Sequence, residues 1–255
     1  MPDTGNAPAP QTSEHRTSAP PSPQRLRAEV LETLPHDRTA FTQGLELHEG
    51  VLYEGTGLAG RSVVTTGAPG AAPDRRTELP REFFGEGITL VGDALWQLTW
   101  RNGVAIERDA STLAERRRVR YYGEGWGLCH QPSQQRLVMS DGSSTLTFRD
   151  PRTFQETGRV RVTEAGRPLT QLNELECTAD GAVYANIWQT DRIARIDPAT
   201  GAVTATIDAA ALHSQSGAPA ADVLNGIAAI PATDEFLLTG KLWPTLYRVR
   251  FVPAD

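Results

Sequence analysis

Long apolar stretches are missing from this 255-residue chain, and none approaches the roughly 18 consecutive apolar residues of a membrane-spanning helix. We therefore expect a soluble protein. Positive charge is also in short supply, because 31 acidic residues outnumber 25 arginine and lysine residues and give a formal net charge of -6. A nucleic-acid backbone needs a basic partner surface, so we expect neither nucleic acid nor a membrane among the partners.

Cysteine is nearly absent, with only Cys129 and Cys177 in the chain. Two thiols exclude a disulfide scaffold and a thiolate metal cluster. Whether the two form a disulfide stays open, and they neither require nor exclude an oxidising compartment. The compartment stays open, and a cytoplasmic protein is only the default expectation, because the N-terminal residues contain no apolar segment of the kind found in a secretion signal.

Lysine is the scarcest charged side chain, since 24 of the 25 cationic residues are arginine and Lys241 is the single lysine. Two interpretations are open at this point. Lys241 is either a functional amine that arginine cannot replace or a leftover of an arginine-rich composition.

The chain divides into two parts by composition. Residues 1–27 are rich in proline, serine, threonine and alanine, which predicts a disordered N-terminal tail. From residue 34 onward, short apolar runs alternate with turn signals such as Asp150-Pro151 and Asp180-Gly181. This pattern predicts strands and hairpins, with the best helix candidate at Asp208 to His213. Residues 28–255 are therefore expected to form one folded domain.

A repeat of about 40 to 50 residues runs through the folded part. A small or acidic residue followed by an aliphatic one opens a strand at Gly44, Gly87, Gly127, Glu174 and Gly226. A second apolar strand follows each opening, at residues 51–53, 94–98, 136–139, 182–187 and 235–238. Five units of this length, each sufficient for four short strands, predict an all-β fold of the five-bladed β-propeller type. A β-sandwich would lack this longer repeat.

Equivalent positions of the repeat meet at one end of a propeller channel, because the first strand of every blade lines it. The residues before the strand openings are Gln43, Glu86, Trp126, Asn173 and Asn225. The ends of the second strands bring Thr56, Trp100, Ser140, Trp188 and Lys241 to the same face. Each residue alone could serve a turn or the core between blades. Together they are typical of a concave small-ligand pocket with an aromatic wall and a few fixed polar groups.

The segments around these positions carry distinctive motifs. They are HDRTAFTQGL at 36–45, FGEG at 84–87, QLTW at 97–100, EGWGL at 124–128, SDGS at 140–143, LNELE at 172–176, NIW at 186–188, LNGI at 224–227 and TGKLWP at 239–244. The region from about residue 34 to residue 251 resembles the plant-type and bacterial glutaminyl-peptide cyclotransferases, or glutaminyl cyclases. The resemblance implies a five-bladed propeller that converts the N-terminal glutamine of peptides or proteins into pyroglutamate and releases ammonia.

The resemblance also implies roles for individual residues. Glu86 matches the family's proton-transfer carboxylate. The substrate-pocket positions of the family fall on Phe41, Gln43, Trp100, Trp126, Asn173, Trp188 and Lys241.

The chemistry of cyclisation supports these assignments. The α-amine attacks the γ-carboxamide of the same residue, which requires a proton carrier and donors for an oxyanion. We expect catalysis by Glu86, Lys241 and Asn173, with Glu176 and Asn225 as further substrate-binding residues.

Metal is not expected at this site, since none of the five histidines has a metal-ligand spacing. The resulting prediction is a monomeric, metal-independent acyltransferase without a cofactor. Two alternatives remain at this stage. Glu86, Asn173 and Asn225 could hold a divalent cation, as in propeller lactonases and esterases, although the charge of Lys241 and three tryptophans disfavour this. The protein could also be a non-catalytic peptide-binding propeller.

Overall fold

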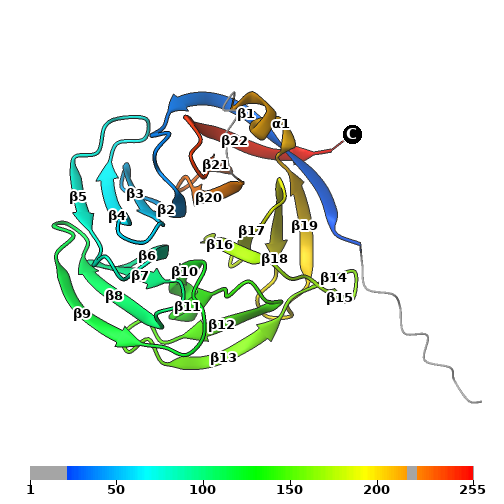
Figure 1. Ribbon diagram of the computed structural model, residues 1–255. Helices are drawn as coiled ribbons and strands as arrows, with labels where there is room; N and C mark the ends of the chain where they lie inside the picture. Colours follow the sequence, from blue (N-terminus) through cyan, green and yellow to red (C-terminus); the bar gives the residue numbers. More distant parts are fainter. Residues whose placement is uncertain (1–21, 217–222, 255) are drawn as a thin grey trace, which may run out of the picture.

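Strands fill most of the described chain, residues 22–216 and 223–254 of a computed structural model (Figure 1). Three four-stranded antiparallel sheets follow one another in sequence. The first contains β2 (Thr42–His48), β3 (Val51–Thr56), β4 (Val63–Gly67) and β5 (Arg75–Glu78). The second contains β6 (Gly85–Val91), β7 (Ala94–Thr99), β8 (Val104–Asp109) and β9 (Glu115–Arg120). The third contains β10 (Leu128–Gln131), β11 (Arg136–Met139), β12 (Thr145–Arg149) and β13 (Glu156–Arg161).

The remaining long strands form one eight-stranded sheet. One half contains β16 (Leu172–Cys177), β17 (Val183–Ile187), β18 (Arg192–Ile196) and β19 (Val203–Asp208). The other half contains β20 (Leu224–Ala229), β21 (Glu235–Gly240), β22 (Thr245–Pro253) and β1 (Gln24–Pro35). Strand β1 joins the halves, because it pairs antiparallel with β22 and parallel with β19.

Short elements complete the described chain. They are a 3-10 turn at Pro132–Gln134, the hairpin of β14 (Thr163–Glu164) and β15 (Arg167–Pro168), and the helix α1 (Ala210–Gln215). The helix lies where the sequence predicts the best helical segment. Within residues 22–216 and 223–254, no helix is long and apolar enough to cross a membrane.

The first strand of each four-stranded unit lies innermost in the ring (Figure 1). Strand β2 contacts β6, β6 contacts β10, β10 contacts β16, β16 contacts β20, and β20 contacts β2 again. These five strands contain or directly follow the openings that the repeat predicts. The all-β prediction is confirmed, and the sheets have a propeller-like arrangement.

The N-terminal tail predicted at residues 1–27 is too long. Strand β1 begins at Gln24, and residues 24–27 pair with residues 205–208 of β19. Hydrogen bonds of the backbone hold this segment in the sheet, and a composition poor in apolar side chains does not reveal them. Residues 1–21 lie outside the described residues.

Apolar side chains fill the space between neighbouring sheets. One cluster contains Trp96, Leu98, Leu128, Leu137 and Phe154, all at most 1% exposed, from the second and third sheets. Aromatic rings and branched aliphatic side chains suit the faces of packed sheets because they fill this space with little rotamer freedom to lose. The core thus fixes the separation of the inner strands, on which the pocket described below depends.

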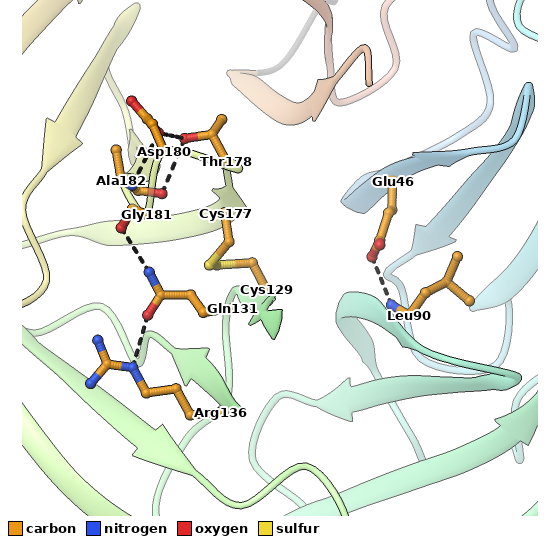
Figure 2. The surroundings of a disulfide bond; sticks show 10 residues. All are labelled: Glu46, Leu90, Cys129, Gln131, Arg136, Cys177, Thr178, Asp180, Gly181 and Ala182. Carbon is orange, nitrogen blue, oxygen red and sulfur yellow. Dashed lines mark hydrogen bonds between the residues drawn. A yellow bond between two sulfur atoms is a disulfide. The ribbon is translucent and has the colours of Figure 1, made fainter. Parts of the chain in front are cut away.

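Cys129 of β10 and Cys177 of β16 form a disulfide, with their Cα atoms 5.4 Å apart (Figure 2). The bond joins two neighbouring inner strands, a pairing that the sequence left open. Gln131, two residues after Cys129, adds a polar link between the same units. Its Nε2 donates to the carbonyl of Gly181 at 2.8 Å, while its Oε1 accepts from the Nε of Arg136 (Figure 2).

Candidate active site

A pocket of about 440 Å³ opens at the end of the ring where the inner strands begin. Its walls are Phe41, Gln43, Phe84, Glu86, Trp100, Trp126, Asn173, Trp188, Gln189, Val223 and Lys241. Eight of the ten site residues predicted from the sequence are among them. Glu176 and Asn225 are the exceptions.

Irregular strand pairing explains why side chains from the inner strands reach this pocket. The register of β2 shifts between Thr42 and Gly44, and that of β6 shifts between Gly85 and Ile88. Similar shifts occur in β16 and β20, beside Asn173 and Asn225. A bulge leaves one residue outside the regular ladder and changes the direction of its side chain. The polar residues before the strand openings lie at these bulges.

Two glycines, one on each side of Glu86, allow the backbone of neighbouring strands to approach β6 closely. A Cβ atom on Gly85 would lie 2.6 Å from the carbonyl oxygen of Thr56. One on Gly87 would lie 2.6 Å from the backbone nitrogen of Leu128. Such contacts are too short for any residue with a side chain, so glycine is required here.

A hydrogen-bond chain from three inner strands orients Glu86. The Nδ2 of Asn225 donates to the Oε1 of Gln43 at 3.2 Å and to the carbonyl of Thr42 at 2.9 Å. The Nε2 of Gln43 in turn donates to the Oε1 of Glu86 at 3.0 Å. Asn225 therefore lies behind Gln43 and supports it, and the structure does not place it among the residues that line the pocket.

The other carboxyl oxygen of Glu86 has a different environment. Glu86 is 4% exposed, and its Oε2 has no hydrogen-bond partner among the described residues. Burial raises the pKa of Glu86 well above its ordinary value, the charge of Lys241 opposes this, and the charge of Glu124 adds to it. A buried carboxyl with a raised pKa can exchange a proton with a bound ligand near neutral pH.

Lys241 lies directly after β21 and is 5% exposed. Its Nζ is 4.8 Å from the centre of the Phe41 ring, a cation–π distance. Backbone bonds fix the segment, since Lys241 donates its N–H to Val223 and Leu242 donates to Ala40. The ammonium is thus held at the pocket wall by its backbone and by an aromatic face.

The aromatic wall consists of two groups of rings. Phe41, Phe84 and Trp100 form one group, with ring centres 6.2 Å and 5.5 Å apart along the series. Trp126 and Trp188 form the other, with their rings edge to face at 5.5 Å. These surfaces fit the aliphatic part of a small ligand and exclude water from it.

Glu176 does not reach this pocket. It lies three residues after Asn173 on β16, beyond the register shift between Leu172 and Leu175, and is not among the residues that line the pocket. Burial raises the pKa of Glu176 well above its ordinary value, and the neighbouring carboxyl groups of Glu46 and Glu174 add to this. The structure therefore does not bring Glu176 together with the pocket residues, and substrate binding by Glu176 stays a prediction.

Three pocket residues were missed by the sequence reasoning, namely Phe84, Gln189 and Val223. A signal for Phe84 was present, because Phe84 stands two residues before Glu86 just as Phe41 stands two residues before Gln43. Gln189 directly follows Trp188, but Val223 carries no comparable mark. Among the described residues, no group of three or more histidine, cysteine, aspartate or glutamate side chains could hold a metal ion.

Comparison with known proteins shows which family this chain resembles. The family model described as glutamine cyclotransferase matches residues 5–251. A glutaminyl-peptide cyclotransferase of Arabidopsis thaliana is 38% identical over 240 residues, which cover 89% of this chain and 72% of the plant protein. The crystal structure of Myxococcus xanthus glutaminyl cyclase is 40% identical, with a TM-score of 0.84 and coverage of 92% of this chain and all of the other.

A more distant structure shares the fold alone. The Cps50 (Swd1) β-propeller domain of Myceliophteria thermophila has a TM-score of 0.51 at 10% identity and covers 87% of this chain and 99% of its own. It supports the propeller-like reading of the sheet arrangement.

Proposed function

The chain belongs to the glutamine cyclotransferase family, and we propose that its pocket cyclises the N-terminal glutamine of peptides and proteins to pyroglutamate, with release of ammonia. One observation supports the assignment of this chemistry to particular residues. The Oε2 of Glu86, which has no hydrogen-bond partner in the part of the chain that the structure describes, is buried in an aromatic pocket that also holds the ammonium of Lys241.

The reaction is an intramolecular acyl transfer from one nitrogen to another. The α-amine forms a bond to the γ-carbon, and the bond from that carbon to the amide nitrogen breaks. Because the nucleophile is tethered to the electrophile, the enzyme gains rate chiefly by holding the folded conformer, moving one proton and stabilising the oxyanion.

Glu86 is the proposed proton carrier. Its carboxylate takes a proton from the attacking nitrogen and returns it to the leaving nitrogen, so that ammonia departs neutral. The raised pKa brings its proton affinity closer to that of the amine, which makes transfer in both directions easier. Gln43 holds Oε1, which leaves Oε2 as the oxygen that exchanges the proton.

Lys241 and Asn173 are the proposed donors to the γ-carbonyl oxygen. Negative charge develops on this oxygen in the tetrahedral intermediate, and a fixed ammonium in a pocket sheltered from water stabilises it strongly. Asn173 lies in the bulge of β16 and lines the same pocket. Trp100, Trp126 and Trp188 would hold the aliphatic part of the glutamine in its curled form.

We infer five blades, no metal requirement and a monomer. Five inner strands in a closed ring support the blade number, with the two halves of the eight-stranded sheet counted as separate blades. The ammonium of Lys241 beside Glu86 disfavours a cation at that position, as a propeller lactonase would need.

A turnover assay tests the proposal. A peptide beginning with glutamine should lose about 17 mass units, the mass of ammonia, and EDTA should not change the rate. The same peptide with an acetylated α-amine should be inert because its nucleophile is blocked. Absence of any mass change across a range of glutamine-initiated peptides would contradict the proposal, and loss of turnover in EDTA with rescue by Ca²⁺ would favour the lactonase-like alternative.

A further inference from the structure

Glu124 connects the two groups of aromatic rings, although it does not line the pocket itself. It lies in the segment between β9 and β10, outside the repeat positions that mark the other site residues. The indole Nε1 of Trp100 donates to its Oε2 at 2.8 Å. The indole Nε1 of Trp126 donates to the same oxygen at 3.0 Å. One carboxylate oxygen therefore accepts from both tryptophans, one from each ring group.

The second oxygen of Glu124 is held from the solvent side by Arg101. The Nε of Arg101 donates to Oε1 at 2.9 Å. The guanidinium of Arg101 also lies 3.8 Å from the centre of the Trp100 ring. Arg101 thus contacts both the carboxylate and one of the rings that the carboxylate orients, in a geometry that suits cation–π attraction.

The two rings are also supported by the backbone. Gly125 donates its N–H to the carbonyl of Trp100 at 2.9 Å, and Trp126 donates to Ser140. A Cβ atom on Gly142 would lie 2.7 Å from the Trp126 ring, so this ring packs directly against backbone on one face. Backbone contacts fix the positions of the two tryptophan residues, whereas the hydrogen bonds from the indole N–H groups to Glu124 fix the orientation of the rings.

The charge of Glu124 also reaches Glu86. Burial of Glu124 raises its pKa, but hydrogen bonds from Trp126, Arg101 and Trp100 outweigh this and lower it. Glu124 is therefore ionised at neutral pH. Within residues 22–216 and 223–254, the charged or titratable groups that act on Glu86 are Lys241, Glu124 and Tyr121, and of the two charged ones only Glu124 favours the protonated form of Glu86.

We propose that Glu124 is a positioning residue for the cyclisation, which locks the indoles of Trp100 and Trp126 in the orientation that closes the aromatic wall around the substrate glutamine. The inference rests on the proposed function of the pocket. Glu124 acts through the tryptophans on binding, and through its charge on the proton affinity of Glu86.

The variant Glu124→Gln tests both actions, because it keeps the size of the side chain and removes its charge. The amide has one acceptor end and one donor end. Its donor end, the NH₂ group, must therefore face another donor, an N–H group of Arg101 or of the indoles. We expect KM for a glutamine-initiated peptide to rise about tenfold, with a smaller fall in kcat. The limb of the pH profile governed by Glu86 should move to lower pH, because the charge that raises its pKa is gone.

Glu156→Gln is the matched control. Glu156 pairs with Arg159 and its side chain is 38% exposed, against 37% for Glu124, but among the described residues no hydrogen bond joins it to a tryptophan of the pocket. KM, pH profile and tryptophan fluorescence should stay as in the wild type. Glu124→Asp separates the two actions, since it keeps the charge but withdraws it by about one C–C bond of 1.5 Å. This variant should raise KM and leave the limb of the pH profile that Glu86 governs at the same pH.

A double-mutant cycle tests whether Glu124 affects KM through the two tryptophans. In a protein that carries Trp100→Phe and Trp126→Phe, which lacks both indole donors, Glu124→Gln should raise KM by less than twofold. Persistence of the tenfold effect in that background would overturn the proposal. So would an unchanged KM and pH profile for Glu124→Gln in the wild-type background.

Tryptophan fluorescence keeps this test separate from the test of the proposed function. Glu124→Gln should change the emission spectrum of the free protein, because two indole N–H groups lose a charged acceptor, and Glu156→Gln should not. An unchanged spectrum would contradict the positioning role even if no peptide were turned over. Absence of wild-type turnover would contradict the proposed function instead.

Discussion

Gln43 and Glu86 come from neighbouring inner strands and share a hydrogen bond of 3.0 Å between Nε2 and Oε1, which leaves the Oε2 of Glu86 without a partner among the described residues. The bond has a clear consequence for chemistry. It fixes which carboxyl oxygen faces the pocket, and it depends on the bulges that turn both side chains inward.

Asn225 should affect catalysis through Gln43 and not through substrate contact. Asn225→Ala removes the donor that holds the Oε1 of Gln43, so the orientation of Glu86 becomes less defined. We expect kcat to fall about tenfold with KM changed less than threefold, and a loss of about 1 kcal/mol in the free energy of unfolding. Steady-state kinetics and denaturant unfolding measure these effects. A rise in KM with normal kcat would return Asn225 to the substrate-binding surface.

Lys241→Arg should cost at least about 100-fold in turnover, near the loss of one oxyanion donor. Arginine keeps the positive charge, but its planar guanidinium is longer and cannot act as a compact donor in a pocket walled by tryptophan. Stability should change little. Near-normal turnover of this variant would make the single lysine a compositional leftover, and the donor role would pass to Asn173.

Glu46 should make the protein less stable as the pH rises. Burial raises the pKa of Glu46 to about 7, against an ordinary value of 4.5, although hydrogen bonds from Thr89 and Leu90 oppose this. The folded protein then holds a proton that the unfolded chain has released, so stability is full below pH 4.5 and falls as the pH rises through 7. Denaturant unfolding of Glu46→Gln between these pH values should show a weaker fall than the wild type. An identical slope would contradict the raised pKa.

Strand β1 should contribute to closure of the ring through residues 24–27. We expect a chain that starts at residue 28 to melt about 5 °C below one that starts at residue 22, because the parallel pairing with β19 is lost. Thermal unfolding of the two shortened chains side by side checks this. Equal melting temperatures would show that the antiparallel pairing of β1 with β22 alone is sufficient.

Much of the site could be predicted because the repeat places equivalent residues at equivalent depth. Gln43, Glu86 and Asn173 lie at bulges of three inner strands, and Trp100 and Trp188 follow the ends of two second strands. A period of about 40 to 50 residues with alternating strands makes such positions visible without a structure.

Other features depend on contacts that a repeat does not encode. Glu176 shares a motif with Asn173, but only Asn173 lines the pocket. Asn225 occupies an equivalent bulge, but its side chain donates a hydrogen bond to Gln43 and does not line the pocket. Glu124 lies outside the repeat positions, and its role follows only from where two indole N–H groups point. The disulfide between Cys129 and Cys177 likewise needed the spacing of β10 and β16.

The variant Glu86→Gln tests the central claim most directly, because it keeps the volume of the side chain and removes its ability to carry a proton. We predict that kcat for a glutamine-initiated peptide falls by about two to four orders of magnitude. KM should change far less, and the melting temperature should stay near that of the wild type. Retention of most of the turnover, or loss of the fold, would show that Glu86 is structural and would contradict the mechanism.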